Sequence, residues 1–441
     1  MWPKALSARS LPALADSRRL RLSAFTLFYL AQGIPLGLLD LAMPAWLAAE
    51  GYTAVQVGTY VATIGLPWAF KLIAGPFMDR FGFPPMGRRR PWVMFAQTGL
   101  MVMLALLAFV HDPATQLVLI AIAGVLVNSF AAAQDVAVDG MAIDVLPVEE
   151  RGRANAFMAF GQVAGVAGMG AISGMLLARF GLLFTGLFAS LLVAVILMMV
   201  IACRERQGER LLPWSQGDAH PSAAALSSSL TGLFGDLRRA VLLPMSLVLS
   251  GAAFTVRAAM GMFIACAPVF AVQELGYSSE TYSQTYGTLI GVCAVAGLAI
   301  GPLVDRLGVR RIFVAALCAG ALMTLSFSLL TELWSVHRLL LAMLVCYLLV
   351  EQIIFICLIA QYMNLTWQQV AATQFAVYMA LSNLGRSVGS GLFAALSVEV
   401  DYERVFQAVG LLYLVALCCA LLFNEKRHQQ DLDRLAGRMG T

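Results

Sequence analysis

Three aspartates stand inside one apolar stretch of the chain and have the clearest chemical potential. Asp135, Asp139 and Asp144 lie in the run from Asn128 to Asn155. A carboxylate at bilayer depth is costly, so it normally faces a protein or water-filled interior and marks an ion pathway or a proton relay. Asp135 and Asp139 are four residues apart and share one helix face, whereas Asp144 lies roughly opposite. The pair indicates proton binding; the alternative is a structural ion pair between helices.

The other charged residues within apolar runs differ in sign between the two halves of the chain. The first half also holds Asp40 and Lys71, and the second holds Arg257, Glu351 and Arg386. An arginine in the membrane can bind a carboxylate or phosphate through two parallel hydrogen bonds. The basic half therefore indicates an anionic substrate, and the acidic half indicates a coupling proton.

Lys71 is expected to lie at the same depth as the aspartate pair. It precedes Asp79 by eight residues, and Asp135 precedes Asp144 by nine, in two segments that run toward the same side. At about 1.5 Å per residue, the two side chains lie at similar levels. We predict that Lys71 pairs with Asp135 or Asp139, either as a static brace or as a contact that opens when a carboxylate is protonated.

The composition is that of a protein that crosses a membrane many times. Of 441 residues, 60% are hydrophobic and 12% are charged, which is about half the charged fraction of soluble domains. The net charge of +4 and the lack of a basic cluster in a soluble segment argue against nucleic acid as a partner. The first twenty residues have no apolar core, so we expect an uncleaved tail. The cysteines have no CxxC spacing, so neither a disulfide nor a metal cluster is expected.

Apolar runs long enough to span a bilayer predict an all-α protein with twelve transmembrane helices in two groups of six. The expected spans are 22–48, 55–78, 92–110, 115–143, 154–178, 181–203, 241–272, 281–303, 311–331, 337–363, 370–397 and 404–424. The expected parts are a tail over 1–21, a six-helix bundle over 22–203, a linker over 204–240, a second bundle over 241–424 and a tail over 425–441. The linker holds an amphipathic stretch around Leu230, Leu233, Phe234 and Leu237 that could lie on the membrane surface.

Basic residues predict the orientation of these spans. Of the 29 lysines and arginines, 23 fall in the tails, the linker and the loops on the same side as them. Because positive loops stay inside, both termini are expected to be cytoplasmic.

An internal repeat relates the two halves. The octapeptide Gly75–Gly82 recurs as Gly301–Gly308, each at the end of the second span of its half. A second repeated segment relates Pro44–Thr53 to Pro268–Ser278. Parallel six-helix repeats with a central site are similar to the major facilitator superfamily, and the octapeptide resembles the loop motif of that superfamily. The resemblance implies a gating latch at Asp79, Arg80, Arg88, Arg89, Asp144, Asp305 and Arg306.

Further polar residues inside the spans are candidates for the site. We expect proton coupling from Asp135, Asp139, Lys71 and Glu351. We expect substrate contacts from Gln32, Asp40, Trp68, Gln134, Gln162, Arg257, Gln352, Asn383 and Arg386. For the amides the alternative is a hydrogen bond between helices, and for Trp68 it is helix packing.

Several short motifs carry a more specific resemblance. They are Gln32-Gly-Ile-Pro-Leu-Gly-Leu38, Gly65-Leu-Pro-Trp68, Gly87-Arg-Arg-Arg90, Gln134-Asp-Val-Ala-Val-Asp-Gly140, Leu146-Pro-Val-Glu-Glu-Arg-Gly152, Ala372-Thr-Gln-Phe375 and Gly385-Arg386. They resemble the family that groups AmpG-type muropeptide permeases with acetyl-CoA transporters. The resemblance implies a proton-driven importer in which Asp135, Asp139, Lys71 and Arg386 matter most. Asp40 departs from the family pattern and adds a charge.

The leading interpretation is a monomeric carrier of the bacterial inner membrane that imports a bulky, muropeptide-like anion by proton symport and alternating access. Siderophores and acyl-CoA or nucleotide conjugates are alternative substrates, and export by proton antiport is the alternative direction. No cofactor is expected.

The same residues also allow two other classes of protein, an enzyme and a sensor. A metal-dependent phosphotransferase would use Asp135, Asp139 and Asp144 as metal ligands, but Asp144 faces away from the other two. A sensor that does not transport would have lost the loop motifs.

Overall fold

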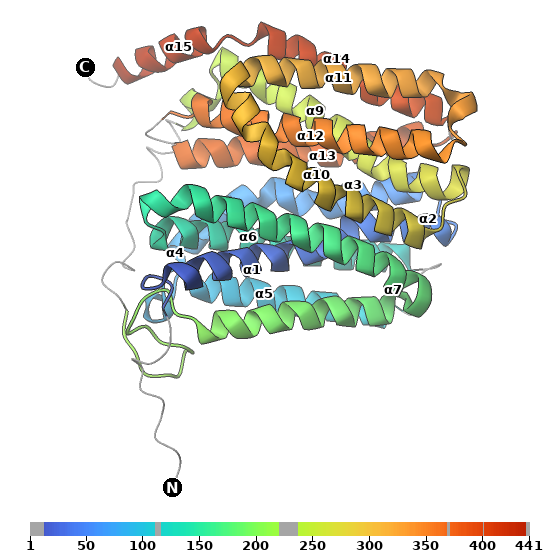
Figure 1. Cartoon of the computed structure of the whole chain (residues 1–441). Coiled ribbons are helices and arrows are strands. Elements are labelled where there is room, and N and C mark those ends of the chain that lie inside the picture. The colour runs from blue at the N-terminus through green and yellow to red at the C-terminus, as the bar shows by residue number, and fades with distance from the viewer. Residues whose placement is uncertain (1–12, 111–115, 220–236, 368–370, 400, 438–441) are drawn as a thin grey trace. The chain divides into compact units, whose positions relative to one another are not determined.

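The computed structural model describes residues 13–110, 116–219, 237–367, 371–399 and 401–437, and these are helical apart from turns and loops (Figure 1). Within them the β-type pairing is an isolated parallel bridge between Ala13 and Arg204. Leu230, Leu233 and Phe234 of the expected amphipathic stretch lie outside the described residues.

The first of two compact units contains most of the first half of the chain. It comprises Met1–Trp46, Ile73–Leu226 and Ser283–Gly287. Its elements are α1 (Arg18–Leu36), η1 (Gly37–Ala42), α4 (Ala74–Arg80), η3 (Pro84–Met86), α5 (Arg90–Leu106), η4 (Leu107–Phe109), α6 (Leu117–Val145), η5 (Val148–Glu150) and α7 (Arg151–Ala202), and α2 (Met43–Ala49) follows η1. Gly181 interrupts α7 with a positive φ of 73°, between the two spans expected there.

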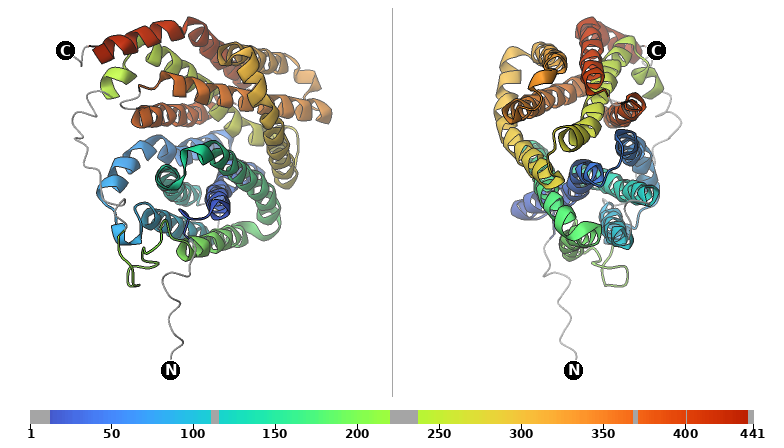
Figure 2. Two further views of the ribbon diagram at one scale, coloured as in Figure 1. Left: turned by 60° about the vertical axis from the view of Figure 1, so that its left-hand side comes forward. Right: turned by 90° about the vertical axis from the view of Figure 1, so that its right-hand side faces the viewer.

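The second unit comprises Leu47–Leu72, Ser227–Tyr282 and Thr288–Thr441. Its elements are α3 (Ala54–Phe70), η2 (Lys71–Ile73), α9 (Pro244–Val269), η7 (Phe270–Glu274), most of α10 (Ser279–Leu307), α11 (Val309–Leu329), η8 (Thr331–Leu333), α12 (His337–Leu365), α13 (Ala371–Leu396), α14 (Tyr402–Leu422) and α15 (Glu425–Gly437). In this unit α3 packs against α9 and α13, and α11 packs against α14 (Figure 2).

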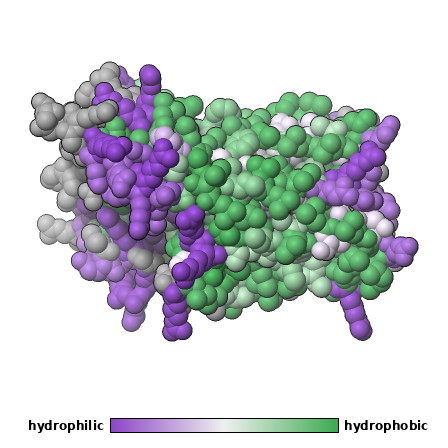
Figure 3. Space-filling view, turned by 90° about the horizontal axis from the view of Figure 1, so that it is seen from above, coloured by the Kyte–Doolittle hydropathy of each residue, from purple (hydrophilic) through white to green (hydrophobic). Residues whose placement is uncertain are grey.

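Seven helical segments in the described residues are long and apolar enough to cross a membrane. They are Arg18–Ala49, Leu117–Val145, Arg153–Ala202, Pro244–Glu274, Val309–Leu329, His337–Leu365 and Tyr402–Leu422. Their outer faces carry exposed apolar side chains, such as Leu191, Val195 and Met198 of α7, and hydrophobic residues cover a broad part of the face seen in Figure 3. Such a surface suits lipid. The count of twelve crossings and the position of the termini stay predictions.

The internal repeat has a structural counterpart at the end of the first span of each half. The first span of each half contains a π-helical turn, η1 or η7, and a glycine with positive φ follows the span, 87° at Gly51 and 71° at Gly276. Two residues later a hydroxyl side chain, from Thr53 or Ser278, accepts a hydrogen bond from the first turn of the next helix. The same local devices therefore end one helix and begin the next in both halves.

Glycines allow α1 and α7 to approach closely. A Cβ atom built on Gly165 of α7 would lie 2.5 Å from the carbonyl oxygen of Leu30, closer than side chains tolerate. Small residues of this kind let membrane helices pack backbone against backbone. This contact places the polar residues of α1 and α7 side by side.

Candidate functional site

A buried hydrogen-bonded network in the first unit surrounds Asp135. Its Oδ1 atom accepts a hydrogen bond of 2.6 Å from Gln32 Nε2 of α1. Gln32 Oε1 in turn accepts a 3.1 Å hydrogen bond from Gln162 Nε2 of α7. Asp135 and Gln32 are buried. Three helices thus supply one chain of polar groups that ends on a carboxylate, and Gln162 fixes the amide of Gln32 with its donor toward Asp135.

Tyr29 is a partner that the sequence analysis did not identify. Its hydroxyl donates a hydrogen bond to Asp139 Oδ1, one turn further along α6. Tyr29 and Gln32 are three residues apart on α1, and Asp139 and Asp135 are four apart on α6, so the contacts run in parallel. The shared face predicted for the two aspartates is the face of α6 that contacts α1. The helical spacing of Tyr29 and Gln32 was the signal available in the sequence.

Two other predicted site residues of this unit lie near the network. Gln134 is buried, and its Nε2 atom donates a 2.8 Å hydrogen bond to the carbonyl of Phe28. This is the contact between helices that the sequence allowed as its alternative. Asp40 is half-buried in the π-helical turn η1, and such turns occur frequently at functional sites.

The predicted residues of α3 and α13 meet in the second unit. Asn383 Nδ2 donates a 3.2 Å hydrogen bond to the carbonyl of Trp68. The Lys71 ammonium lies 5.7 Å from the centre of the Trp68 ring, within cation–π range. The predicted pairing of Lys71 with Asp135 or Asp139 joins residues of different units and stays a prediction.

Glu351 and two arginines form the charged group of the second unit. Glu351 is buried in α12 and accepts a 2.5 Å hydrogen bond from the Tyr413 hydroxyl. Arg257 of α9 lies 5.9 Å from the centre of the Phe355 ring and donates to the sulfur of Met260. Arg257 interacts electrostatically with both Glu351 and Arg386. Arg257 thus lies close enough to a second guanidinium and to a carboxylate to be influenced by both.

Arg386 and Gln352 are half-buried beside this group. A Cβ atom on Gly261 of α9 would collide with the carbonyl of Arg386. The backbones of α9 and α13 therefore touch at Arg386, and the contact fixes the position of Arg386 relative to Gly261. A Cβ atom on Gly297 would lie 3.1 Å from the Gln352 side chain, so α10 packs closely beside it.

The predicted latch residues of the first half gather at the ends of α5 and α6. Asp144 lies 3.6 Å from Arg88 Nη1 and 3.6 Å from Arg89 Nε. Arg80 lies over the ring of Phe81, and Arg306 in the second half is exposed. The side chains of Asp79 and Asp305 lie outside the part that the structure describes. The latch role stays a prediction for all of these residues.

A second group of charges, missed from the sequence, lies beside this latch. Glu205 is buried and accepts hydrogen bonds from the backbone N–H groups of Arg88, Arg89 and Arg90, at 3.0, 2.7 and 2.5 Å. A carboxylate at a helix N-terminus is favoured by the unpaired N–H groups there. Burial nevertheless raises the pKa of Glu205.

Arg90 and Glu209 complete this group. The Arg90 guanidinium donates to the carbonyls of Val200, Ile201, Arg210 and Leu211. It thereby joins the end of α7 to the linker. Burial raises the pKa of Glu209 to about 7. The linker was expected to be a polar connection, but residues 204–218 fold onto the first unit.

No cluster of metal-ligating side chains is found among the described residues.

The comparisons with known proteins agree with this architecture. The family model of the Major Facilitator Superfamily matches residues 23–390. The chain belongs to the Major Facilitator Superfamily. It is accordingly a multi-pass membrane protein of a transporter family, and the sequence-based expectation is confirmed.

Curated relatives of this superfamily member include the anhydromuropeptide permease of Escherichia coli (strain K12). It is 33% identical over 175 residues, which are 39% of this chain and 35% of the permease. The putative transporter AmpG 1 of Rickettsia felis is 27% identical over 184 residues, or 40% of this chain and 41% of that protein. The predicted resemblance to AmpG-type permeases is confirmed, but the chain matches well under two thirds of these relatives.

Solved structures of other transporters share the fold. A D-xylose-proton symporter has a TM-score of 0.69 at 12% identity and covers 92% of this chain and 95% of its own. An inward-facing bacterial homolog of the human lysosomal transporter Spinster has a TM-score of 0.68 at 16% identity and covers 94% of this chain and 99% of its own. At these identities the likeness concerns the fold alone.

Proposed function

We propose that this superfamily member imports a bulky anionic solute of the muropeptide class by proton symport and alternating access. One observation carries the proposal. A buried carboxylate, Asp135, accepts from an amide of α1 that an amide of α7 in turn orients, in a chain that resembles an anhydromuropeptide permease over 175 residues. A carboxylate kept at such depth marks a proton pathway.

Proton coupling is assigned to Asp135 and Asp139, with Glu351 as a third carboxylate in the second unit. Uptake of a proton by Asp135 would remove its negative charge. The hydrogen bond from the Gln32 amide, whose orientation Gln162 sets, would then be made to a neutral acid and would lose its charge-assisted part. Protonation would thereby loosen the contact of α6 with α1, and Lys71 would be the cation that responds to the change in charge.

Anion binding is assigned to Arg257 and Arg386, which interact electrostatically with each other, and Arg257 also interacts with Glu351. A guanidinium binds a carboxylate bidentately, and the peptide part of a muropeptide carries carboxylates. Gln352, Asn383 and Trp68 would supply hydrogen bonds and an aromatic surface for the remainder of the ligand. The same set would accept the acids of siderophores or the phosphates of acyl-CoA conjugates, which are the alternative substrates.

The remaining parts of the proposal concern topology and gating. We propose twelve crossings with both termini in the cytoplasm of a bacterium, because the basic residues gather on that side. The contacts of Asp144 with Arg88 and Arg89 would stabilise one state of the transport cycle, since such an ion pair breaks when the helix ends separate. A monomer suffices.

The test is uptake of a labelled anhydromuropeptide by proteoliposomes with an inward proton gradient, imposed and then collapsed. We expect uptake that depends on the gradient. Arg386→Gln and Arg257→Gln should each raise the KM about tenfold or more, because a charge-assisted hydrogen bond contributes about 1.5–3 kcal/mol. Arg404→Gln is the matched control, since Arg404 is exposed and pairs with Asp401 at the surface.

The outcomes distinguish the parts of this proposal. Folded wild-type protein without uptake would contradict the muropeptide assignment and direct the same assay to siderophores and acyl-CoA conjugates. Uptake unaffected by collapse of the gradient would contradict symport alone. An unchanged KM in both arginine variants would contradict the anion site alone.

A further inference from the structure

The C-terminal helix α15 is docked on the second unit by two side chains. Leu432 is 5% exposed and packs in an apolar cluster with Ala240, Trp367 and Leu243. His428, one turn earlier, is 1% exposed. The two residues are four apart and therefore lie on the same face of the helix. A helix with so few apolar residues depends on this one face for its position.

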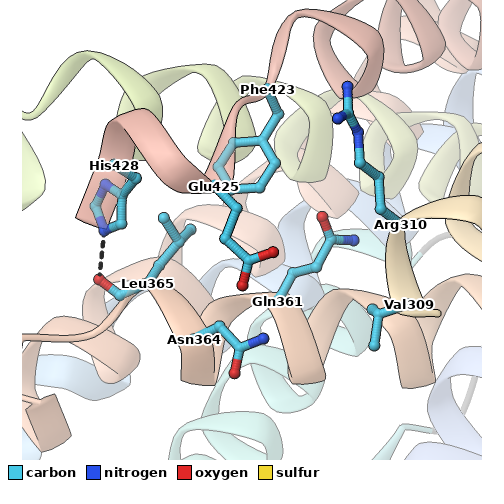
Figure 4. A pocket seen from close by; sticks show the side chains of 8 residues that line it. All are labelled: Val309, Arg310, Gln361, Asn364, Leu365, Phe423, Glu425 and His428. Carbon is cyan, nitrogen blue, oxygen red and sulfur yellow. Dashed lines mark hydrogen bonds between the residues drawn. The ribbon is translucent and has the colours of Figure 1, made fainter. Parts of the chain in front are cut away.

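His428 makes a directed contact with the end of α12. One of its ring nitrogens, Nε2, lies 3.0 Å from the carbonyl oxygen of Leu365 (Figure 4). A carbonyl can only accept, so Nε2 carries the proton and Nδ1 is the bare nitrogen of a neutral ring. Nδ1 is buried and has no hydrogen-bond partner among the described residues. A second proton on this ring would therefore be placed where no group can accept it.

The charged groups around His428 come from two elements. Glu425 and Asp431 of α15 favour a charged ring. Arg310 of α11 lies across the small cavity, of about 30 Å³, that also contains Glu425 and the amides of Gln361 and Asn364 (Figure 4). Burial outweighs the two carboxylates and lowers the pKa of His428. The docked helix thus favours the neutral ring.

The carbonyl that His428 holds belongs to a wider network. Leu365 O also accepts from Gln374 Nε2 at 3.4 Å, and Gln374 Oε1 accepts from the backbone N–H of Trp367 at 2.8 Å. Gln374 also donates to the Tyr378 hydroxyl. These contacts join the end of α12 and the start of α13 to α15. Gln374 belongs to the Ala372-Thr-Gln-Phe375 motif, so that motif acts here as a structural joint.

We propose that α15 is a pH-dependent clamp: it holds the ends of α9, α12 and α13 together while His428 is neutral, and protonation of His428 releases it. The histidine has a lowered pKa in the docked state, so docking is complete above the ordinary histidine range and is lost as the pH falls through the lower, docked value. On the side that basic residues predict to be cytoplasmic, an acid load would free these helix ends. In a proton importer, as proposed above, release of α15 would therefore respond to the accumulation of protons, which are the co-transported ion.

The test is hydrogen–deuterium exchange of residues 425–437 in the full-length protein in nanodiscs, between about pH 8 and about pH 5, corrected for intrinsic exchange. We expect protection at the higher pH and its loss at the lower. His428→Gln keeps a donor of similar reach without a titrating group, so it should stay protected throughout. Leu432→Asp should remove protection at every pH, which shows that the readout follows docking.

Protection of the wild type that does not change with pH would overturn the proposal. So would a His428→Gln variant that loses protection in acid as the wild type does, because another group would then be titrating. His337→Gln, which changes an exposed histidine at the start of α12, should behave as the wild type. Because the readout is local exchange, it does not depend on which solute is transported.

Discussion

Gln32 Nε2 donates a 2.6 Å hydrogen bond to Asp135 Oδ1, so α1 directly holds the buried carboxylate of α6. Gln162 of α7 orients the amide that makes this bond. Protonation of Asp135 would remove the negative charge that strengthens this bond, so a change in its protonation would alter a contact between two helices.

The first prediction concerns this bond. Gln32→Leu removes the donor and leaves Asp135 buried, so the free energy of unfolding should fall by about 1–3 kcal/mol. The measurement is the midpoint of thermal unfolding in detergent. Gln361→Leu is the matched control, because Gln361 Nε2 makes a long 3.4 Å bond to a carbonyl of its own helix. An equal decrease of the unfolding midpoint in both variants would contradict a specific contribution of the bond to Asp135.

The second prediction concerns the packing of α1 on α7. In Gly165→Ala the new methyl group would lie 2.5 Å from Leu30 O, and such overpacking costs about 1–3 kcal/mol. Gly168→Ala in the same helix is the control, since a Cβ there would have no neighbour within 4 Å. Thermal unfolding should show a lower midpoint for the first variant and an unchanged or higher one for the second. A destabilised Gly168→Ala would contradict the account.

The third prediction concerns the pH dependence of the folded linker. Burial raises the pKa of Glu209 to about 7, so the folded form favours the protonated carboxyl. The contribution of this residue to linker stability is present below the ordinary carboxyl range and is lost as the pH rises through about 7. Hydrogen exchange of residues 204–218 should therefore be slower at about pH 6 than at about pH 8, after correction for intrinsic exchange. Glu209→Gln should reduce the difference to the part that Glu205 contributes, and wild-type protection that grows with pH would contradict the sign.

The helices could be predicted from the sequence because hydrophobic runs and turn residues are local signals. Gly51 and Gly276 lie between expected spans, and the structure places positive φ angles there. The aspartate pair could also be found, since a carboxylate in an apolar run is conspicuous and its spacing defines a face.

The partners of these residues could not be predicted as readily. Tyr29 looks like any aromatic in an apolar helix until α6 is placed beside it. Glu205 and Glu209 lie in a polar segment and read as solvated charges, whereas their burial depends on contacts with the loop before α5. Tertiary contact, which local pattern does not encode, decides both cases.

The most direct test of the central claim is proton-driven accumulation by Asp135→Asn in proteoliposomes. The account predicts that this variant loses accumulation of labelled anhydromuropeptide under an inward proton gradient but retains counterflow exchange, because the substrate arginines are intact. Asp218→Asn, an exposed linker residue, should behave as the wild type. Full gradient-driven accumulation by Asp135→Asn would contradict the assignment of the coupling proton to this carboxylate.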